Sequence, residues 1–153
     1  MNFDELSDTD IQTLLSLPKR VTNPGAKWKE KPGHRQKNFN ISTDDYDFQV
    51  YVRQSLNDQD DFSCGLKVIK PDGQPLTLVR YNGPSHVHGD IEFQCHIHRA
   101  TEHAIRAGRK PESEASATAK YRTLDGAIFE LVNDCAISGI AGLGRDEPDL
   151  FGH

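Results

Sequence analysis

Four of the seven histidines fall within thirteen residues, in the run HVHGDIEFQCHIH from His86 to His98. Histidine is the side chain whose ordinary pKa lets both protonation states coexist near neutral pH, so paired histidines suit general acid–base chemistry. Cleavage of a phosphodiester without a metal requires such a pair. His96 and His98 are two residues apart in an alternating stretch, so we expect them to project from the same polar side of a strand.

Three interpretations of this histidine cluster stay open. The first is an acid–base pair, which needs no cofactor. The second is a zinc site with His86, His88, His96 and His98 as ligands, since neutral imidazoles bind zinc well, although no Cys-x-x-Cys or His-Glu-x-x-His motif accompanies them. The third is structural, with the rings bonded to carboxylates such as Glu92. Whether His86 and His88 share a face with the second pair depends on the hairpin register between them.

A nuclease of this kind also needs groups that stabilise the charge on the phosphate oxygens. The segments LVRYNGPSH and TAKYRT supply such groups, and from them we take Arg80, Lys120 and Tyr121 as candidates. Each also has a plain structural interpretation. Tyr121 can fill the rim of the core, and the two cations can be solvated.

Charge is unevenly distributed along the chain. The net charge is −5, yet residues 19–37 hold seven Lys or Arg against one acid, Glu30. A basic stretch is often a solvated loop, but an aromatic ring among cations can stack a nucleobase while its neighbours hold phosphates. We therefore predict a basic loop or arm at 19–37 that binds nucleic acid through Lys27, Trp28, Lys29, Lys31, Arg35 and Lys37.

Hydrophobic periodicity predicts the elements that must position these residues. Ser7 is a plausible N-cap for a short helix that Pro18 ends, a second short helix is expected at 101–107, and residues 124–135 carry an apolar stripe at helical spacing. Apolar residues alternate in five stretches, 39–41, 46–53, 62–68, 76–81 and 91–98. The predicted fold is α+β: a meandering antiparallel sheet of five or six strands with an N-terminal helix and C-terminal helices on one face, the other face being polar and partly open.

Length and composition bound the class of protein. The chain of 153 residues has the length of one domain, and we expect a single domain over 1–138 followed by a disordered, glycine-rich tail at 139–153. No apolar run approaches the ~18 residues that a membrane span needs. The acidic start MNFDELSDTD is unlike a presequence, and the three cysteines lie among apolar neighbours, as free core thiols do. These features predict a cytoplasmic protein without a membrane partner; they say nothing about its oligomeric state.

The order of these motifs resembles a known family. A strand is followed by R-Y-N-G-P-S-H-x-H, a second strand ends in H-I-H, and a short Y-x-x-L-x-x-A helix comes later. Over residues 65–137 this layout resembles the TumE-type toxins of bacterial toxin–antitoxin modules and related bacterial and prophage families. It departs from the two-histidine phosphoesterase pattern, which has Ser or Thr where this chain has His88 and His98.

The resemblance implies a cytosolic growth-inhibiting toxin that cleaves RNA and is held inactive by a cognate antitoxin protein. The residues that it carries over are His86, His88, His96, His98 and Tyr121. Our first hypothesis is therefore a toxin-like, metal-independent endoribonuclease of a toxin–antitoxin or phage-defence module. The alternatives are a zinc-binding hydrolase or zinc-stabilised scaffold, and a non-catalytic inhibitor module that binds nucleic acid or protein.

Overall fold

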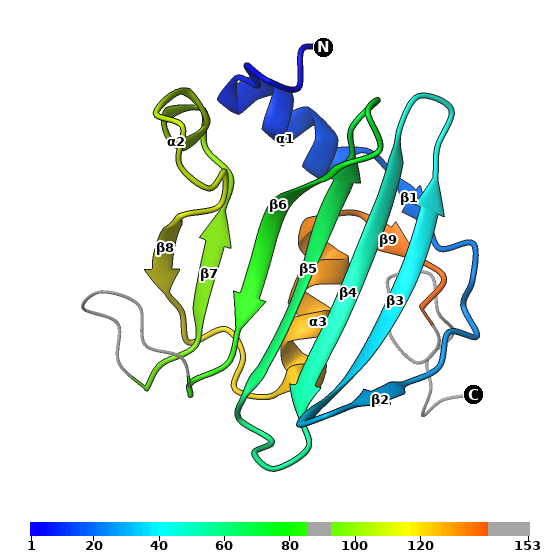
Figure 1. Cartoon of the computed structure of the whole chain (residues 1–153), viewed down its shortest axis with the longest axis vertical. Helices are drawn as coiled ribbons and strands as arrows, with labels where there is room; N and C mark the ends of the chain where they lie inside the picture. Colours follow the sequence, from blue (N-terminus) through cyan, green and yellow to red (C-terminus); the bar gives the residue numbers. More distant parts are fainter. Residues whose placement is uncertain (86–92, 141–153) are drawn as a thin grey trace.

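The computed structural model describes residues 1–85 and 93–140. Seven antiparallel strands form one sheet in which each strand pairs with its neighbour in sequence, and helix α3 (Leu124–Asp134) covers one face (Figure 1). The α+β meander is therefore confirmed, with seven strands in this sheet in place of five or six. The strands are β2 (Lys29–Lys31), β3 (His34–Ser42), β4 (Asp47–Ser55), β5 (Phe62–Ile69), β6 (Pro75–Asn82), β7 (His96–Arg99) and β8 (Glu114–Ala117).

The central strands bury alternate apolar side chains beneath α3. Val50 and Val52 of β4 lie opposite Leu66 and Cys64 of β5, and all four are at most 1% exposed. Helix α3 lies against β5 and β6 and adds Leu131, which is fully buried, from the apolar stripe that the sequence predicts. Burying side chains of this size stabilises the fold by about 1.5–3 kcal/mol each, so this face is the core.

The expected core thiols are confirmed. All three cysteines, Cys64, Cys95 and Cys135, are free and buried. Burial disfavours the thiolate and raises the pKa of each thiol, that of Cys135 to about 12. We therefore assign these cysteines no reactive role.

The N-terminal helix α1 (Asp8–Ser16) begins as the sequence predicts. The Ser7 hydroxyl accepts a hydrogen bond from the Asp10 backbone N–H, and the Asp10 carboxylate accepts one from the Ser7 N–H, which completes a capping box. Ile11 and Leu14 bury the inner face of the helix.

Lys19 belongs to the packed interior and not to a basic arm. Its ammonium donates to the carbonyl oxygens of Leu15, Leu17 and Cys135 at 2.8–2.9 Å. Lys19 therefore connects the C-terminal end of α1 to the C-cap of α3. The residue is 2% exposed, and burial lowers its pKa to about 8. Around it, β1 (Lys19–Arg20) and β9 (Ile137–Ser138) form a separate parallel pair.

The second half of the basic segment is mostly strand, where the sequence predicts a loop or arm, whereas residues 21–28 lie outside the strands. Strand β2 and the extended start of β3 form a hairpin whose turn is Pro32-Gly33, with φ 83° at Gly33. That sequence suits a type II turn, which takes proline first and needs a positive φ at its second position. Every residue of β2 is exposed, so the strand has no alternation of apolar residues by which the sequence could predict it.

The strand predicted at 91–98 is wrong at its start. Strand β7 begins at His96, because Phe93 adopts a left-handed backbone (φ 52°) and is 75% exposed instead of packing in the core. Residues 91 and 92 lie outside the described residues. Strand β8 pairs with β7 in a stretch that is not among the predicted strands. Helix α2 (Glu102–Arg106) lies between them, close to its predicted place.

No helix in the described ranges is long and apolar enough to cross a membrane. The predicted tail begins too early, since Ile140 is 4% exposed and belongs to the core. The remainder of that predicted tail, 141–153, lies outside the described residues.

Candidate functional site

The register of β6 with β7 decides which face of the sheet carries the histidines. His96 lies opposite Asn82, and His98 lies opposite Arg80. Ile97, between them, lies opposite Tyr81, whose hydroxyl reaches the end of α3. Both histidines therefore project from the polar face, away from α3, as their spacing predicts. His86 and His88 lie outside the described residues.

The two imidazoles are close together and each is held by a hydrogen bond. Their ring centroids are 5.1 Å apart. Nδ1 of His98 lies 3.0 Å from the Glu112 carbonyl oxygen, and Nδ1 of His96 lies 3.2 Å from that of Gln94. Because a carbonyl oxygen can only accept, both rings carry a proton on Nδ1, and in the neutral ring Nε2 holds the lone pair. His96 Nε2 accepts from the Asn82 side-chain amide at 3.3 Å.

Both rings are buried, which differs from what the sequence predicts. His96 is 1% and His98 2% exposed, whereas a partly open polar face was expected. For His98, one cause is the backbone at Glu112, which lies against the ring as its hydrogen-bond acceptor. A substrate can reach the Nε2 atoms only if the packing around the rings opens.

Arg80 and Glu112 form an ion pair beside these rings. The Arg80 guanidinium Nη1 lies 3.3 Å from the Glu112 carboxylate, and the two side chains are 23% and 5% exposed. Nε of Arg80 and Oδ1 of Asn82 are buried without a hydrogen-bond partner in the part of the chain that the structure describes. Unsatisfied buried polar atoms of this kind are rare and call for an explanation such as a bound ligand or water. We define the polar-face cluster as Arg80, Asn82, His96, His98 and Glu112.

Next to this cluster lies a tyrosine that sequence reasoning missed. Tyr51 of β4 bonds the Ser63 hydroxyl at 3.0 Å, and burial raises its pKa to about 12 although Ser63 and Arg80 oppose the shift. A Cβ on Gly65 would lie 2.8 Å from the Tyr51 ring, so the glycine makes room for this ring. Lys67 places its ammonium 5.0 Å from the ring centroid. The signal in the sequence was the alternation of β4, which puts Tyr51 on the polar face.

Two of the predicted catalytic residues lie elsewhere. The Tyr121 hydroxyl donates to the backbone carbonyls of Asn82 and His96, its ring packs against Phe62 and Tyr81 of the core, and burial raises its pKa. Tyr121 therefore ties β6 to β7 from the core side. Lys120 is an exposed residue of the connection between β8 and α3.

The predicted nucleic-acid-binding residues divide between the two faces of the sheet. Lys29 and Lys31 pair with Gln36 and His34, which the register puts on the polar face. Arg35 and Lys37 project from the opposite face, the one that α3 covers, and Lys27 is exposed in the loop before β2.

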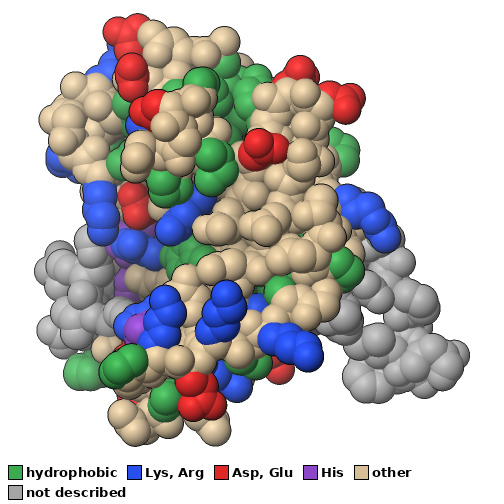
Figure 2. All heavy atoms as spheres, turned by 45° about the vertical axis from the view of Figure 1, so that its right-hand side comes forward, with side chains coloured by type: hydrophobic (Ala, Val, Ile, Leu, Met, Phe, Trp, Pro, Cys, Tyr) green, Lys and Arg blue, Asp and Glu red, His purple; other side chains and the backbone are tan. Residues whose placement is uncertain are grey.

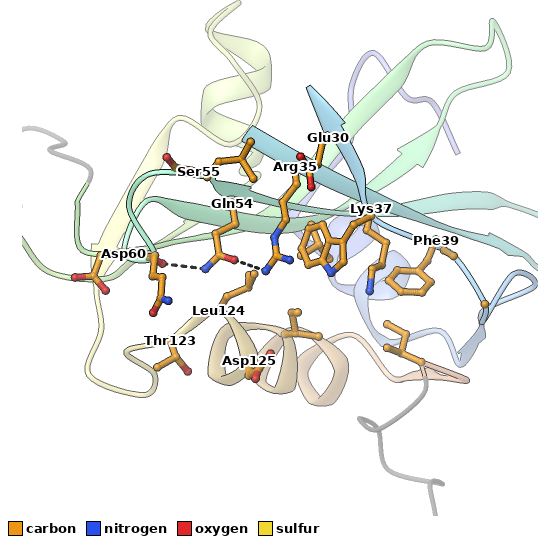
Figure 3. A pocket seen from close by; sticks show the side chains of 18 of the residues that line it. Glu30, Arg35, Lys37, Phe39, Gln54, Ser55, Asp60, Thr123, Leu124 and Asp125 are labelled. Atoms are coloured by element: carbon orange, nitrogen blue, oxygen red, sulfur yellow. Dashed lines mark hydrogen bonds between the residues drawn. The ribbon is translucent and has the colours of Figure 1, made fainter. Parts of the chain in front are cut away.

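On the α3 side, Arg35 and Lys37 border a groove of about 880 Å³ that reaches the start of α3 at Leu124 (Figure 3). Arg35 lies 4.0 Å and Lys37 4.7 Å from the centroid of the Trp28 ring, and Arg35 also donates to the Gln54 amide oxygen at 2.7 Å. The π-electrons of Trp28 thus already contact two cations. The predicted base-stacking role of Trp28 would have to compete with them.

The zinc alternative finds no ligand set within residues 1–85 and 93–140, where no three His, Cys, Asp or Glu residues are grouped to hold a metal ion. That alternative also includes His86 and His88, which lie outside the described residues, so it stays untested.

In Figure 2, Lys and Arg side chains lie next to the visible histidine side chains. Two imidazoles, a guanidinium and a carboxylate on one sheet face form a set that can transfer protons and hold an anion. Comparison of the chain with family models, with curated proteins and with solved structures gives no match.

Proposed function

We propose that this protein is a metal-independent endoribonuclease whose acid–base pair is His96 and His98. The observation that carries the proposal is the placement of two imidazoles, with centroids 5.1 Å apart, on one sheet face beside Arg80. The reaction is attack of a ribose 2′-OH on the adjacent phosphorus. A base removes the 2′ proton, an acid protonates the departing 5′ oxygen, and the products are a 2′,3′-cyclic phosphate and a free 5′-OH.

His98 is suited to the role of base. Its Nδ1 donates to the Glu112 carbonyl oxygen, and this hydrogen bond fixes the tautomer, so that the lone pair of the neutral ring is on Nε2. Arg80, opposite His98 on the neighbouring strand, is placed to hold the phosphate that lies next to the base.

His96 is suited to the role of acid because of its partner. In the neutral ring, Nε2 accepts a hydrogen bond from Asn82 Nδ2, which can only donate. Protonation of Nε2 turns it into a donor, so it no longer accepts from Asn82 Nδ2 and carries the proton that the leaving oxygen needs. At 3.3 Å the bond is long for its type, and its loss costs little.

Arg80 is suited to stabilise the charge that builds on the phosphorane oxygens. Its Nε–H has no hydrogen-bond partner among the described residues, and Glu112 engages Nη1. Glu112 therefore orients the guanidinium while leaving donors for a phosphate. In this proposal Glu112 is a positioning residue.

The same proposal includes the biological setting that the sequence resemblance implies: a toxin-like protein of the cytoplasm, with RNA as substrate and a cognate antitoxin as its protein partner. Its support is the layout R-Y-N-G-P-S-H-x-H followed by H-I-H in residues 80–98. Growth arrest on expression of the chain, relieved by a protein encoded beside it, is the test of that setting.

Cleavage of a single-stranded RNA in the presence of EDTA tests the enzymatic proposal. We expect cleavage by the wild-type chain, none of the same sequence made as DNA, and a bell-shaped pH dependence. His96→Gln and His98→Gln keep a hydrogen-bonding side chain and should each abolish cleavage. The matched control is His103→Gln, at an exposed histidine on α2, which should cleave RNA as fast as the wild type. Cleavage that survives both substitutions refutes the proposal, and cleavage that needs added zinc favours the zinc-dependent alternative.

A further inference from the structure

The polar face of the sheet is strongly cationic although the chain is acidic overall. Paired positions in the ladders put five cations on this face of the strands: Lys29, Lys31, Arg53, Lys67 and Arg80. By the same register, Asp47 is the one acidic strand residue on this face within the described part of the chain. Glu112 adds a carboxylate from outside the strands, and it is already paired with Arg80.

These five cations, which we call the polar-face track, are spread across the sheet. Four of the strands from β2 to β6 contribute, and neighbouring strands lie about 4.8 Å apart. Arg80 is nearest to the histidines, Lys67 follows on β5 and Arg53 on β4. The lysines of β2 are exposed at the far edge. A chain molecule that follows the track from its β2 end therefore arrives at Arg80, which lies beside the buried His96 and His98.

The middle of the track is held in place. The Tyr51 ring lies against Gly65 and is fixed by its bond to Ser63, and Lys67 extends its ammonium over this ring. The cation–π contact keeps the charge of Lys67 on the face instead of letting it swing into solvent. Arg53 is exposed on the same face.

The cations on the α3 side are likewise held by an aromatic ring. Arg35 and Lys37 contact Trp28, and Arg35 also bonds Gln54. The groove there is bordered by Asp60 and Asp125 as well, so its charge is mixed. Charge complementarity to a polyanion therefore favours the polar-face track over the groove.

We propose that the polar-face track binds the backbone of single-stranded RNA and leads it to the histidines. This inference rests on the proposed function and names the binding surface of that same site. Attack in line by a 2′-OH requires a backbone that is free to rotate, which a paired A-form helix restrains, so the track is matched to an unpaired strand. The length of RNA bound on the track is set by the number of phosphates that its five cations can contact.

Binding of a fluorescent 2′-O-methyl oligouridylate tests the track apart from catalysis, because this RNA lacks the attacking hydroxyl. Affinity is measured at several salt concentrations for the wild type, for Arg53→Gln/Lys67→Gln, and for Arg99→Gln/Arg122→Gln. The last variant removes the same charge from two exposed sites, Arg99 lying on the α3 side of β7. Circular dichroism checks that all three chains are folded.

We expect the slope of log Kd against log salt concentration to be lower by about 1.4 in the track variant, because it loses two phosphate contacts and each contact on a single strand contributes about 0.7. The control variant should keep the wild-type slope. Equal slopes in both variants, or no binding by the wild type, overturn the track. Competition by polyglutamate as strong as that by RNA overturns it in favour of an acidic protein partner. Binding as expected without cleavage of natural RNA refutes the proposed function and leaves the track intact.

Discussion

The ion pair between Arg80 and Glu112 predicts an asymmetric response to substitution. Glu112 is nearly buried, whereas Arg80 is partly exposed (5% and 23% of the side chain). Arg80→Met leaves a buried carboxylate without its cation, and we expect a loss of about 3–5 kcal/mol in the free energy of unfolding. Glu112→Gln leaves a guanidinium that water still reaches and keeps an amide beside it, so we expect a loss of about 1–2 kcal/mol.

The double variant Arg80→Met/Glu112→Gln removes both charges and isolates their coupling. It should cost less than the sum of the single losses, by about 2 kcal/mol, because no unpaired charge remains buried. Urea unfolding with a common m-value gives the four free energies of the cycle. If Arg80→Met costs no more than Glu112→Gln, or if the coupling is near zero, the pair is an incidental surface contact. The assignment of Glu112 as a positioning residue then fails.

Three further predictions follow from individual contacts. Tyr121→Phe should lower the free energy of unfolding by about 1–3 kcal/mol, measured in urea, because two buried carbonyls of β6 and β7 lose their donor; an unchanged midpoint would contradict the role assigned to this hydroxyl. Gly65→Ala should lower the free energy of unfolding by about 1–3 kcal/mol in the same assay, since the new Cβ would lie 2.5 Å from the Val79 carbonyl oxygen and 2.8 Å from the Tyr51 ring; an unchanged midpoint would mean that the strand adapts without cost. The stability of the wild type relative to Lys19→Met should rise with pH: burial lowers the pKa of Lys19 from 10.5 to about 8, so between these values the unfolded chain binds more protons at this site. Urea midpoints of the wild type and of Lys19→Met, measured below and above this pH range, give the change in their difference in stability. If this difference falls as the pH rises, the hydrogen bonds to the three carbonyls outweigh the desolvation of the ammonium.

The sheet was predictable wherever one face is apolar and the other polar. Strands β4, β5 and β6 follow the alternation in the sequence, because one side of each strand must enter the core. Strand β8 carries small and charged residues, of which none is fully buried, and it exists through its pairing with β7. Propensity and pattern carry no information about such an edge strand. The same holds for β2.

The site was predictable only in part. The spacing of His96 and His98 fixes their shared face, because a strand has a period of two. The burial of His98 depends in part on Glu112, which follows α2 by six residues and contacts His98 in a way that no local pattern encodes. The structure puts the candidate Arg80 opposite His98, on the neighbouring strand. The position of Tyr121 on the core side could not be predicted, because its hydroxyl bonds backbone carbonyls that the sequence does not show.

The strand register also changes what the basic segment can do. A loop would allow Lys29, Lys31, Arg35 and Lys37 to meet one ligand together. In the hairpin that they form, alternation sends the first two to the polar face and the last two to the α3 side, with the sheet between them. One extended RNA strand on the polar face therefore cannot use all four, and neutralising each pair separately should have unequal effects on binding. The local count of seven cations within residues 19–37 overstates the charge available to any one ligand.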